Sequence, residues 1–452
     1  MSEQIHENKM GVMPVKRLII SMSLPMMISM LVQALYNIVD SLFVAQISED
    51  ALTAVTLAFP MQNLMIAVAT GTGVGINALL SRALGARELD DANKAANNGI
   101  LLMAASSILF VMIGFFLTGP FVSTQTDSPF IAEYAEEYIS IVTICSIGLF
   151  FQMAFERLLQ STGKTLLSMI SQITGAVINM ILDPVMIFGW FGLPAMGVTG
   201  AAIATCIGQC CAAVVAFILN VKFNKEIRLS MSEVFSLSGS IIRKIYNVGV
   251  PSIFMVSIGS IMTYGMNIIL GGFSSTAQAV FGVYFRLQSF FFMPVFGLNN
   301  GLIPVIAFNY GARKKARILE ALRFSVVLAF VVMCTGTLVL EIFPKLLLMM
   351  FDASDVMIEL GVPALRIIGL HFPMAAIAIA LISVFQALAK SYYSLIVSLA
   401  RQLVVLLPAA WLLSLTGVVG NVWWSFVIAE VISLIVTLFF YTRIKRKMID
   451  VM

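Results

Sequence analysis

The sequence predicts an all-α membrane protein with twelve transmembrane helices in two pseudo-symmetric six-helix bundles. Three observations predict it: the composition, a succession of twelve apolar runs, and a repeat with a period of half the chain. Of the 452 residues, 60% are hydrophobic and only 11% are charged, whereas a soluble domain has about 25% charged residues. One soluble core cannot bury this excess of apolar side chains, so a lipid bilayer is the expected solvent.

Each of the twelve apolar runs is long enough to cross a bilayer, which takes about 20 residues. These runs are expected to be helices, because every backbone polar group must be satisfied within the lipid. The first run is longer than a signal-peptide core and lacks a cleavage pattern, so it is expected to be retained. The expected spans are 18–44, 53–80, 95–118, 133–156, 166–189, 196–220, 240–270, 277–306, 322–343, 358–385, 394–415 and 421–441.

Positive charges lie almost entirely on one side of these spans. Lys9, Lys16 and Arg17 precede the first span, the next loop has no basic residue, and this alternation continues to the C-terminal tail. Because cytoplasmic loops carry the excess of Lys and Arg, both termini are expected in the cytoplasm of a multi-pass inner (plasma) membrane protein. The pattern assigns 24 of the 27 basic residues to this side, including Lys390 and Arg401, and excludes nucleic acid as the reason for the net charge of +4.

The two halves of the chain resemble each other when one is shifted onto the other by half the chain length. This offset aligns the GAR tripeptide 85–87 with the GAR tripeptide 311–313, and Pro25 with Pro251. It also carries each of the first six spans onto one of the last six. Six is an even number, so both halves have the same orientation and form a parallel repeat about an axis along the membrane normal.

The polar segment 222–240 separates the two halves and is expected to be a cytoplasmic linker. The predicted domains are therefore an N-terminal lobe (1–221), this linker, and a C-terminal lobe (241–452). Two pseudo-symmetric bundles suit alternating access by a rocking motion, and the sequence has no P-loop motif for direct use of ATP. This organisation indicates a secondary transporter.

Two carboxylates within spans are the main functional candidates. Asp40 shares a helix face with Gln33 and Asn37, and Asp183 shares one with Asn179. Each buried Asp costs about 2.5–3.5 kcal/mol on insertion scales, so intramembrane acids indicate function by default. With the amide oxygens beside them, they could hold a coupling ion, either H⁺ or Na⁺; Asp40, Asp183 and Asn179 are the expected ligands if the ion is sodium. The alternative is that these acids only satisfy neighbouring polar groups.

Four residues of the first half are candidates for contact with substrate. Glu156 lies at the cytoplasmic end of the fourth span with Gln152 one turn away, and the first span adds Gln33 and Tyr36. Glu156 could attract a cationic substrate from inside, or it could be a solvated helix end. The offset of half the chain length maps Asp40, Glu156 and Asp183 onto apolar residues of the second half. Ion binding is therefore expected in the first bundle.

In the second half, the stretch 283–301 is rich in Phe and Met. Such side chains form a deformable apolar wall that can accept aromatic cations, which makes Arg286, Phe290 and Met293 substrate-binding candidates. Packing or contact with lipid is the alternative for the apolar residues, whereas Arg286 needs an acidic or carbonyl partner. His371 in the tenth span is better explained as a packing residue than as a proton carrier.

The sequence resembles the multidrug and toxic compound extrusion (MATE) family over nearly its whole length. The resemblance rests on LPMMISMLVQALYNIVDSLFVAQ, GTGVGINALLSRALGAR, ERLLQSTGKT, NMILDPVMIFGWFGLPAMGVTGAAIAT and FRLQSFFFMPVFGLNNG. It implies two lobes in a V and export of diverse, often cationic compounds in exchange for H⁺ or Na⁺. The family's N-lobe acids correspond to Asp40 and Asp183, and Glu156 matches an acid of one prokaryotic branch. Another branch has an ion-binding Glu and Asp in the seventh and tenth spans. Here neither 240–270 nor the interior of 361–385 contains an acid, which favours N-lobe coupling.

Other functions fit the pattern less well. A flippase for lipid-linked sugars or lipids would need several cations in its cavity, and only Arg286 and Arg366 are available within spans. A solute importer with paired halves is another option. We see no catalytic grouping that would make the protein an enzyme, and the five cysteines, all in apolar runs, read as buried free thiols without a metal. No cofactor is expected, and the expected partners are small organic cations and drugs together with membrane lipid, bound by a monomer.

Overall fold

The computed structural model describes residues 8–126, 128–351 and 353–452, which are helical and contain no β-strand. Among these residues, ten helices and two bent helix pairs are long and apolar enough to cross a membrane. Counting each bent pair as one span gives twelve, so the expected all-α membrane fold is confirmed. The N-terminal residues 1–7, which belong to the predicted lobe 1–221, lie outside the described part.

The two halves contribute six spans each. The first six are α2 (Val15–Ala45), α3 (Glu49–Ala86), α4 (Leu89–Phe116), the pair α6 (Pro129–Ile144) and α7 (Ile147–Ser161), α8 (Thr165–Phe188) and α9 (Gly197–Phe223). The last six are α11 (Gly239–Gly271), α12 (Ser275–Gly311), α13 (Lys315–Ile342), the pair α15 (Asp355–Gly369) and α16 (Phe372–Ala387), the run α17 (Ser391–Leu399), η2 (Ala400–Leu406) and α18 (Leu407–Ser414), and the run α19 (Val419–Val422), α20 (Trp424–Ile444) and η3 (Lys445–Ile449). Short helices outside these spans are α1 (Lys9–Val12), α5 (Thr118–Ser123), η1 (Trp190–Gly192), α10 (Met231–Val234) and α14 (Pro344–Met349).

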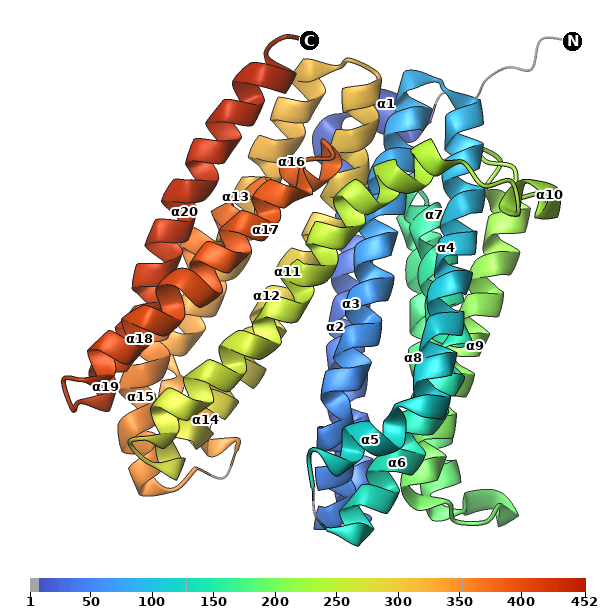
Figure 1. Ribbon diagram of the computed structural model, residues 1–452. Coiled ribbons are helices and arrows are strands. Elements are labelled where there is room, and N and C mark those ends of the chain that lie inside the picture. The colour runs from blue at the N-terminus through green and yellow to red at the C-terminus, as the bar shows by residue number, and fades with distance from the viewer. Residues whose placement is uncertain (1–7, 127, 352) are drawn as a thin grey trace, which may run out of the picture.

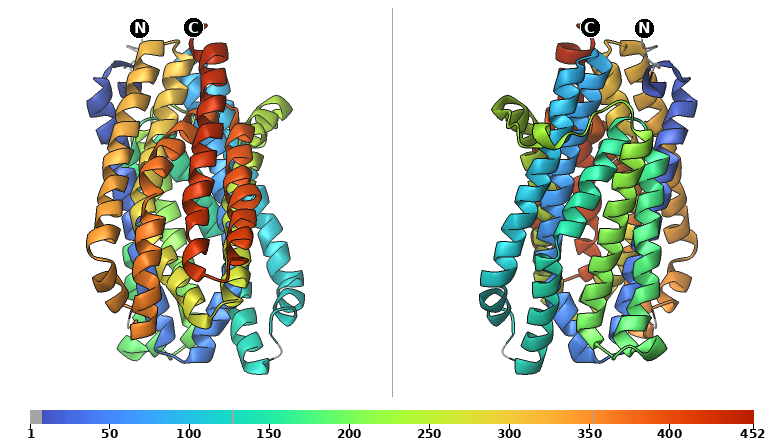
Figure 2. Two further views of the ribbon diagram at one scale, coloured as in Figure 1. Left: turned by 90° about the vertical axis from the view of Figure 1, so that its left-hand side faces the viewer. Right: turned by 90° about the vertical axis from the view of Figure 1, so that its right-hand side faces the viewer.

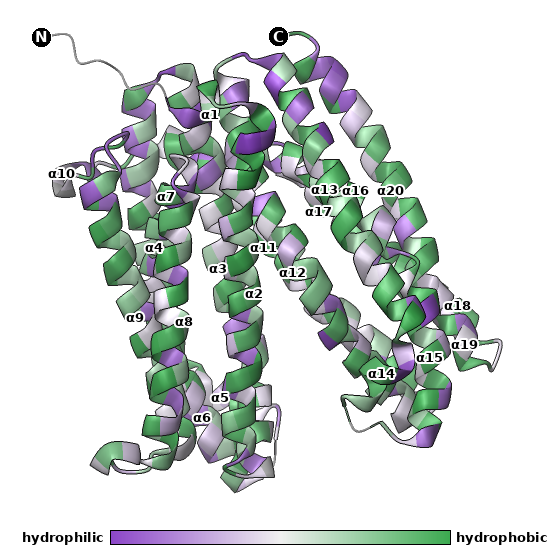
Figure 3. Ribbon diagram, turned by 180° about the vertical axis from the view of Figure 1, so that it is seen from behind, coloured by the Kyte–Doolittle hydropathy of each residue, from purple (hydrophilic) through white to green (hydrophobic). Residues whose placement is uncertain are grey.

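The helices of the two halves form a V (Figure 1). They lie close together at the end that carries α1 and the C-terminus and diverge towards the opposite end. The side views show the C-terminus at this same end (Figure 2). Hydrophobic residues cover most of the length of the helices, whereas many hydrophilic residues lie at the end of the C-terminus (Figure 3).

Both bent pairs break at equivalent positions of the repeat. The axes of α6 and α7 differ by 43°, and those of α15 and α16 by 45°. The residues at these breaks include Cys145 and His371, which the offset of half the chain length relates to each other. In the second half Pro373 follows the break, and a proline disfavours helical geometry in the residue before it.

Small residues let the two halves approach closely where they meet. A Cβ atom on Gly75 of α3 would lie 2.3 Å from the carbonyl oxygen of Ile245 in α11. A Cβ atom on Gly301 of α12 would lie 2.8 Å from the Cα of Ser23 in α2. Only glycine permits these backbone contacts, which are typical of helix packing in membranes.

The GAR tripeptides that reveal the repeat end two equivalent helices. Arg87 follows α3 with φ of 62°, and Arg313 follows α12 with φ of 54°. Both residues therefore take the left-handed conformation that commonly ends a helix.

The short helix α1 binds the opposite half of the chain. Lys314 donates from Nζ to the carbonyl oxygen of Gly11 at 2.8 Å, and Arg317 donates from Nη2 to that of Met13 at 2.7 Å. Asn309 donates to the carbonyl of Met10 at 3.1 Å. These bonds join the halves at the end where the helices converge.

The linker docks onto α4 through two buried asparagines. The side-chain oxygen of Asn97 accepts from the backbone of Ser230 at 3.2 Å, and that of Asn98 from the backbone of Ser238 at 2.9 Å. The linker therefore lies against the first half of the chain.

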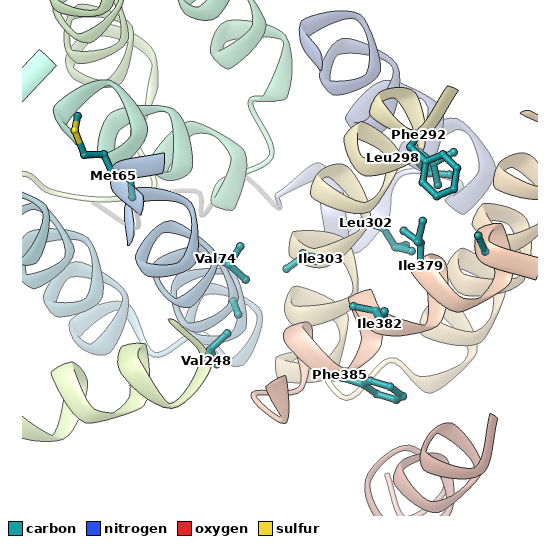
Figure 4. Packing of buried hydrophobic residues seen from close by; sticks show 14 of the residues in the cluster. Met65, Val74, Val248, Phe292, Leu298, Leu302, Ile303, Ile379, Ile382 and Phe385 are labelled. Carbon is teal, nitrogen blue, oxygen red and sulfur yellow. The ribbon is translucent and has the colours of Figure 1, made fainter. Parts of the chain in front are cut away.

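Apolar packing within the second half joins α12 to α16. Figure 4 shows Ile379 and Ile382 of α16 beside Leu302 of α12, and all three side chains are buried. This contact places α12 between the core of its own half and the N-terminal half.

One expectation about the charges is wrong. Arg401 does not lie in a cytoplasmic loop, because the helix begins at Ser391 and Arg401 is the second residue of the π-helical segment η2 within it. Pro408 follows shortly after η2 and cannot donate a backbone hydrogen bond, which favours such a local change of helical register. The eleventh span, expected over 394–415, therefore contains a cation that the charge pattern had counted with the cytoplasmic residues.

Candidate functional site

A cluster of polar side chains lies inside the first half of the chain. Its charged members are Asp40 of α2 and Asp183 of α8, which are close enough to interact with each other directly. Asp183 is fully buried and Asp40 is half-buried. The sequence predicted both acids, and the structure brings them together.

Hydrogen bonds from α8 and α9 position Asp183. Asn179, one turn earlier in α8, donates from Nδ2 to Oδ1 of Asp183 at 3.2 Å. The same amide lies 3.3 Å from the hydroxyl of Thr205 in α9. This contact is possible because Gly175 and Gly208 let the two helices approach so closely that a Cβ on either would lie within 3.0 Å of the other's backbone.

Two tyrosines complete the cluster around Asp40. Tyr36, one turn earlier in α2, interacts electrostatically with Asp40 and with Asp183. Tyr138 of α6 interacts with Asp40, and its hydroxyl accepts a hydrogen bond from Nε2 of Gln62 in α3 at 3.1 Å. The sequence analysis missed Gln62, Tyr138 and Thr205, because nothing in the chain's periodicity connects α3, α6 and α9 to the acids.

Three oxygen atoms of this cluster are buried without a hydrogen-bond partner in the described part of the chain. They are Oδ1 of Asp40, Oδ2 of Asp183 and Oδ1 of Asn179. An unpaired buried acceptor costs about 1–3 kcal/mol, and more when it is charged. Three such acceptors at one place form a site that a proton or a small cation would stabilise.

The donor set is suited to a hard cation or a proton. The described residues contain no group of three His, Cys, Asp or Glu side chains that could hold a metal ion. Two carboxylates with an amide oxygen and tyrosine hydroxyls nearby are oxygen ligands of the kind that hard cations prefer. The chemistry of the cluster therefore fits H⁺ and Na⁺ alike.

The other candidates in α2 lie differently from Asp40. Asn37 is exposed, and Gln33 is half-buried one turn before it. Ser41 donates to the backbone carbonyl of Asn37 at 2.9 Å. The structure thus places the Asn37 side chain on an open face of α2, apart from the buried cluster.

Glu156 is buried, so the interpretation as a solvated helix end is wrong. Its side chain is 2% exposed. Its Oε1 accepts from Nε2 of Gln152 at 3.0 Å and from the hydroxyl of Ser171 at 3.4 Å. The next residue, Arg157, is also buried and donates to Oδ1 of Asn300 in α12 at 3.4 Å, which joins this region to the second half.

The candidates of α12 share one face that is directed towards the first half. Arg286, Phe290, Met293 and Gly297 are spaced by four, three and four residues, which keeps them on one side of a helix. A Cβ on Gly297 would lie 2.6 Å from the backbone of Met27 in α2. Arg286 and Phe290 are exposed, so they continue this face into the space where the V widens.

A second buried polar group lies in the second half, and the sequence analysis missed its acid. Glu430 of α20 is 3% exposed and lies near His371 and Arg401. His371 itself is buried, and its Nε2 lies 3.1 Å from the hydroxyl of Tyr284. A carboxylate within the twelfth apolar run is the signal in the sequence that could have identified Glu430.

Comparisons with known proteins cover most of the chain and agree on one family. A family model described as MatE matches residues 25–185 and again residues 251–412. The multidrug export protein MepA of Staphylococcus haemolyticus (strain JCSC1435) is 24% identical over 94% of this chain and 93% of its own length. An FAD transporter of Shewanella oneidensis is 26% identical over 88% of each chain. A crystal structure of MATE in complex with MaL6 has a TM-score of 0.92 at 24% identity and covers 98% of this chain and 99% of its own.

Proposed function

Because the chain belongs to the MatE family, we propose that it is a cation-coupled antiporter exporting diverse, often cationic drugs and toxic compounds by alternating access. The relatives are transporters by name, and the proposed role is transport without catalysis. The small organic cation is the substrate, H⁺ or Na⁺ is the coupling ion, and the protein acts as a monomer in lipid.

The three unpaired oxygens of Asp40, Asp183 and Asn179 are the observation that carries ion coupling. Asp40 and Asp183 are on different helices, so an ion or proton that binds between them changes how α2 packs against α8. Without it, two carboxylates face each other in a buried site, which is unfavourable. Ion occupancy can therefore shift the balance between two packings of the N-terminal lobe.

We assign the lobes to 1–221 and 241–452, the linker to 222–240, and both termini to the cytoplasmic side of the inner membrane. The bonds between α1 and residues 309–317 then close the cytoplasmic side. The widening of the V faces outward, so this conformation is the one that releases substrate and admits the coupling ion.

The substrate would bind where α12 faces the first half. Phe290 and Met293 provide adaptable apolar contacts, and Gln33, Tyr36 and Asn37 of α2 provide polar ones. Glu156 and Gln152 are at least half-buried in the outward-widening conformation, so their contact with substrate belongs to the inward-open state. Arg286 limits how many positive charges a substrate can carry.

Two other substrates compete with this proposal. The FAD transporter among the relatives suggests an anionic dinucleotide, which the exposed Arg286 would favour. A lipid or lipid-linked sugar flippase is the remaining alternative, and it would use the same V-shaped arrangement.

The test is transport by the purified full chain in liposomes. We expect ethidium to move against its gradient when a proton gradient or a sodium gradient is imposed, and the gradient that drives it identifies the coupling ion. FAD and a fluorescent phospholipid are tested in parallel. Movement of FAD or phospholipid without ethidium would contradict the proposal, and ethidium movement that neither gradient accelerates would contradict ion coupling.

A further inference from the structure

The buried group in the C-terminal half joins four separate spans. Tyr284 comes from α12, His371 from the break between α15 and α16, Arg401 from η2 and Glu430 from α20. Tyr284, His371 and Glu430 are each at most 5% exposed. Arg401 is 23% exposed in its side chain, which makes it the least buried member of the group.

The carboxylate of Glu430 lies between the imidazole of His371 and the guanidinium of Arg401. Its Oε2 lies 3.6 Å from Nδ1 of His371 and 3.6 Å from Nη1 of Arg401. Both distances are too long for a hydrogen bond. Oε1 of Glu430 and Nδ1 of His371 are accordingly buried without a hydrogen-bond partner in the described part of the chain.

The surroundings of His371 are suited to an imidazolium. Nε2 has the Tyr284 hydroxyl at 3.1 Å as an acceptor, and Nδ1 faces the Glu430 carboxylate. Phe426 stacks on the ring at 6.1 Å with an angle of 24°, and Phe372 lies edge-on at 5.1 Å. Aromatic faces stabilise a nearby cation.

In the described part of the chain, the charged and titratable groups around His371 are Tyr284, Arg401 and Glu430. From α13, which packs on both α15 and α16, the neutral Thr337 donates to the carbonyl of Gly369 at 2.9 Å. Arg366 of α15 is directed to the backbone carbonyl of Glu341 at 3.2 Å and is exposed.

We propose that His371 is a second proton-binding site of this protein and that its protonation transfers Glu430 from Arg401 to the imidazolium. The proton comes from water and binds Nδ1, and Glu430 then accepts from that N–H. Arg401 loses its counter-ion and moves towards solvent, which rearranges η2. The repeat-related residue is Cys145, so this site exists in one half only.

The position of the site indicates what the proton would change. His371 lies at the 45° break of the tenth span, and Arg401 lies in a π-helical segment. Such segments occur frequently at functional sites. A change in the partner of the Glu430 carboxylate, from Arg401 to His371, therefore changes how the tenth, eleventh and twelfth spans pack in the C-terminal lobe.

The chain allows a direct measurement of this proton. It contains two histidines, His6 and His371, so the His6→Gln variant of the full chain retains one imidazole. We expect ring ¹⁵N resonances of this variant in lipid nanodiscs to change between the neutral and protonated forms within about pH 5–8. A ring that stays neutral over this range would overturn the proposal.

The role of Glu430 has a matched control in the same lobe. In the same background, Glu430→Gln removes the counter-ion. Half-protonation of His371 should then require an about tenfold higher proton concentration. Glu341→Gln neutralises an acid near the exposed Arg366 and should leave the titration unchanged. An unchanged titration in Glu430→Gln, or equal changes in both variants, would overturn the transfer of Glu430.

A transport measurement tests whether the site takes part in the proposed antiport. Only this experiment rests on the proposed function. If ethidium export is proton-driven, His371→Gln should export ethidium with one proton fewer per molecule. An unchanged proton count would show that His371 binds its proton outside the transport cycle. The resonance titration does not require transport, so failure of the antiport and failure of the site are distinguishable.

Discussion

Gly71 of α3 and Gly297 of α12 are related by the offset of half the chain length, and so are the two residues that they contact. A Cβ on Gly71 would lie 2.4 Å from Cγ1 of Ile253, and a Cβ on Gly297 would lie 2.6 Å from Cα of Met27. The interface between the halves is thus the same contact made twice, with the roles of the halves exchanged.

This relationship predicts the effect of a single methyl group. Gly297→Ala should lower the free energy of unfolding by about 1–3 kcal/mol, because the added Cβ meets backbone that cannot move aside easily. Gly282→Ala on the same helix is the control, since a Cβ there would meet nothing within 4 Å. Thermal unfolding in detergent measures both, and equal stability of the two variants would contradict the interface.

The carboxylate cluster predicts a separation of expression from activity. Asp40→Asn should insert normally, because Asn is no more costly to bury, yet lose gradient-driven export since one ion-binding oxygen pair becomes a neutral amide. Asp50→Asn, at an exposed position of α3, should export like the wild type. Export by Asp40→Asn at the wild-type rate would reduce Asp40 to a structural residue.

Two substitutions of Glu156 can distinguish a role in protein stability from a role in substrate binding. Glu156→Ala leaves the amide of Gln152 without its acceptor, whereas Ser171 keeps its hydrogen bond to the carbonyl of Ala212 at 2.8 Å. The lost bond and the vacated space should cost about 1–3 kcal/mol of stability. Glu156→Gln retains an acceptor oxygen, so it should unfold close to the wild-type temperature and show only weaker ethidium export. If Glu156→Gln exports at the wild-type rate and only Glu156→Ala is impaired, the residue has no part in substrate binding.

The two arginines of the C-terminal spans should differ in importance. Arg286 lies on the face of α12 that is directed towards the first half, whereas Arg366 is exposed and directed to Glu341. Arg286→Ala should therefore change the rate of ethidium export more than Arg366→Ala does, as measured in liposomes. Unaltered export in both variants would show that Arg286 does not face the transport path.

The orientation can be checked with impermeant thiol reagents. In a background with the five cysteines replaced by alanine, Ser232→Cys in the linker should resist labelling from outside intact cells. Thr416→Cys, in the turn after α18, should be labelled, and both positions are exposed. Efficient labelling at position 232 would invert the proposed topology.

Periodicity and composition were sufficient for the fold. Apolar runs of about 20 residues can only be satisfied as helices in lipid, so the spans followed from local sequence. The repeat followed from identical residues at one offset, and its GAR segments are equivalent helix ends with Arg87 and Arg313 in the left-handed conformation. Asp40, Asn179 and Asp183 could be found because an acid in an apolar run is conspicuous.

Tertiary structure decided which polar residues meet. Gln62, Tyr138 and Thr205 join the carboxylates from three other helices, and local periodicity contains no information about contacts between helices. Glycine pairs at the crossings set those contacts, as Gly175 and Gly208 do for α8 and α9.

The position of Arg401 also depended on the fold. A charge count reads an arginine in the first half of a span as part of the preceding loop, because a lone cation within the membrane is too costly. Glu430, which comes later in the chain, brings a carboxylate from α20 to within 3.6 Å of this arginine. The sequence therefore determines the helices and the symmetry between the halves, whereas the pairing of buried charges exists only once the helices have packed.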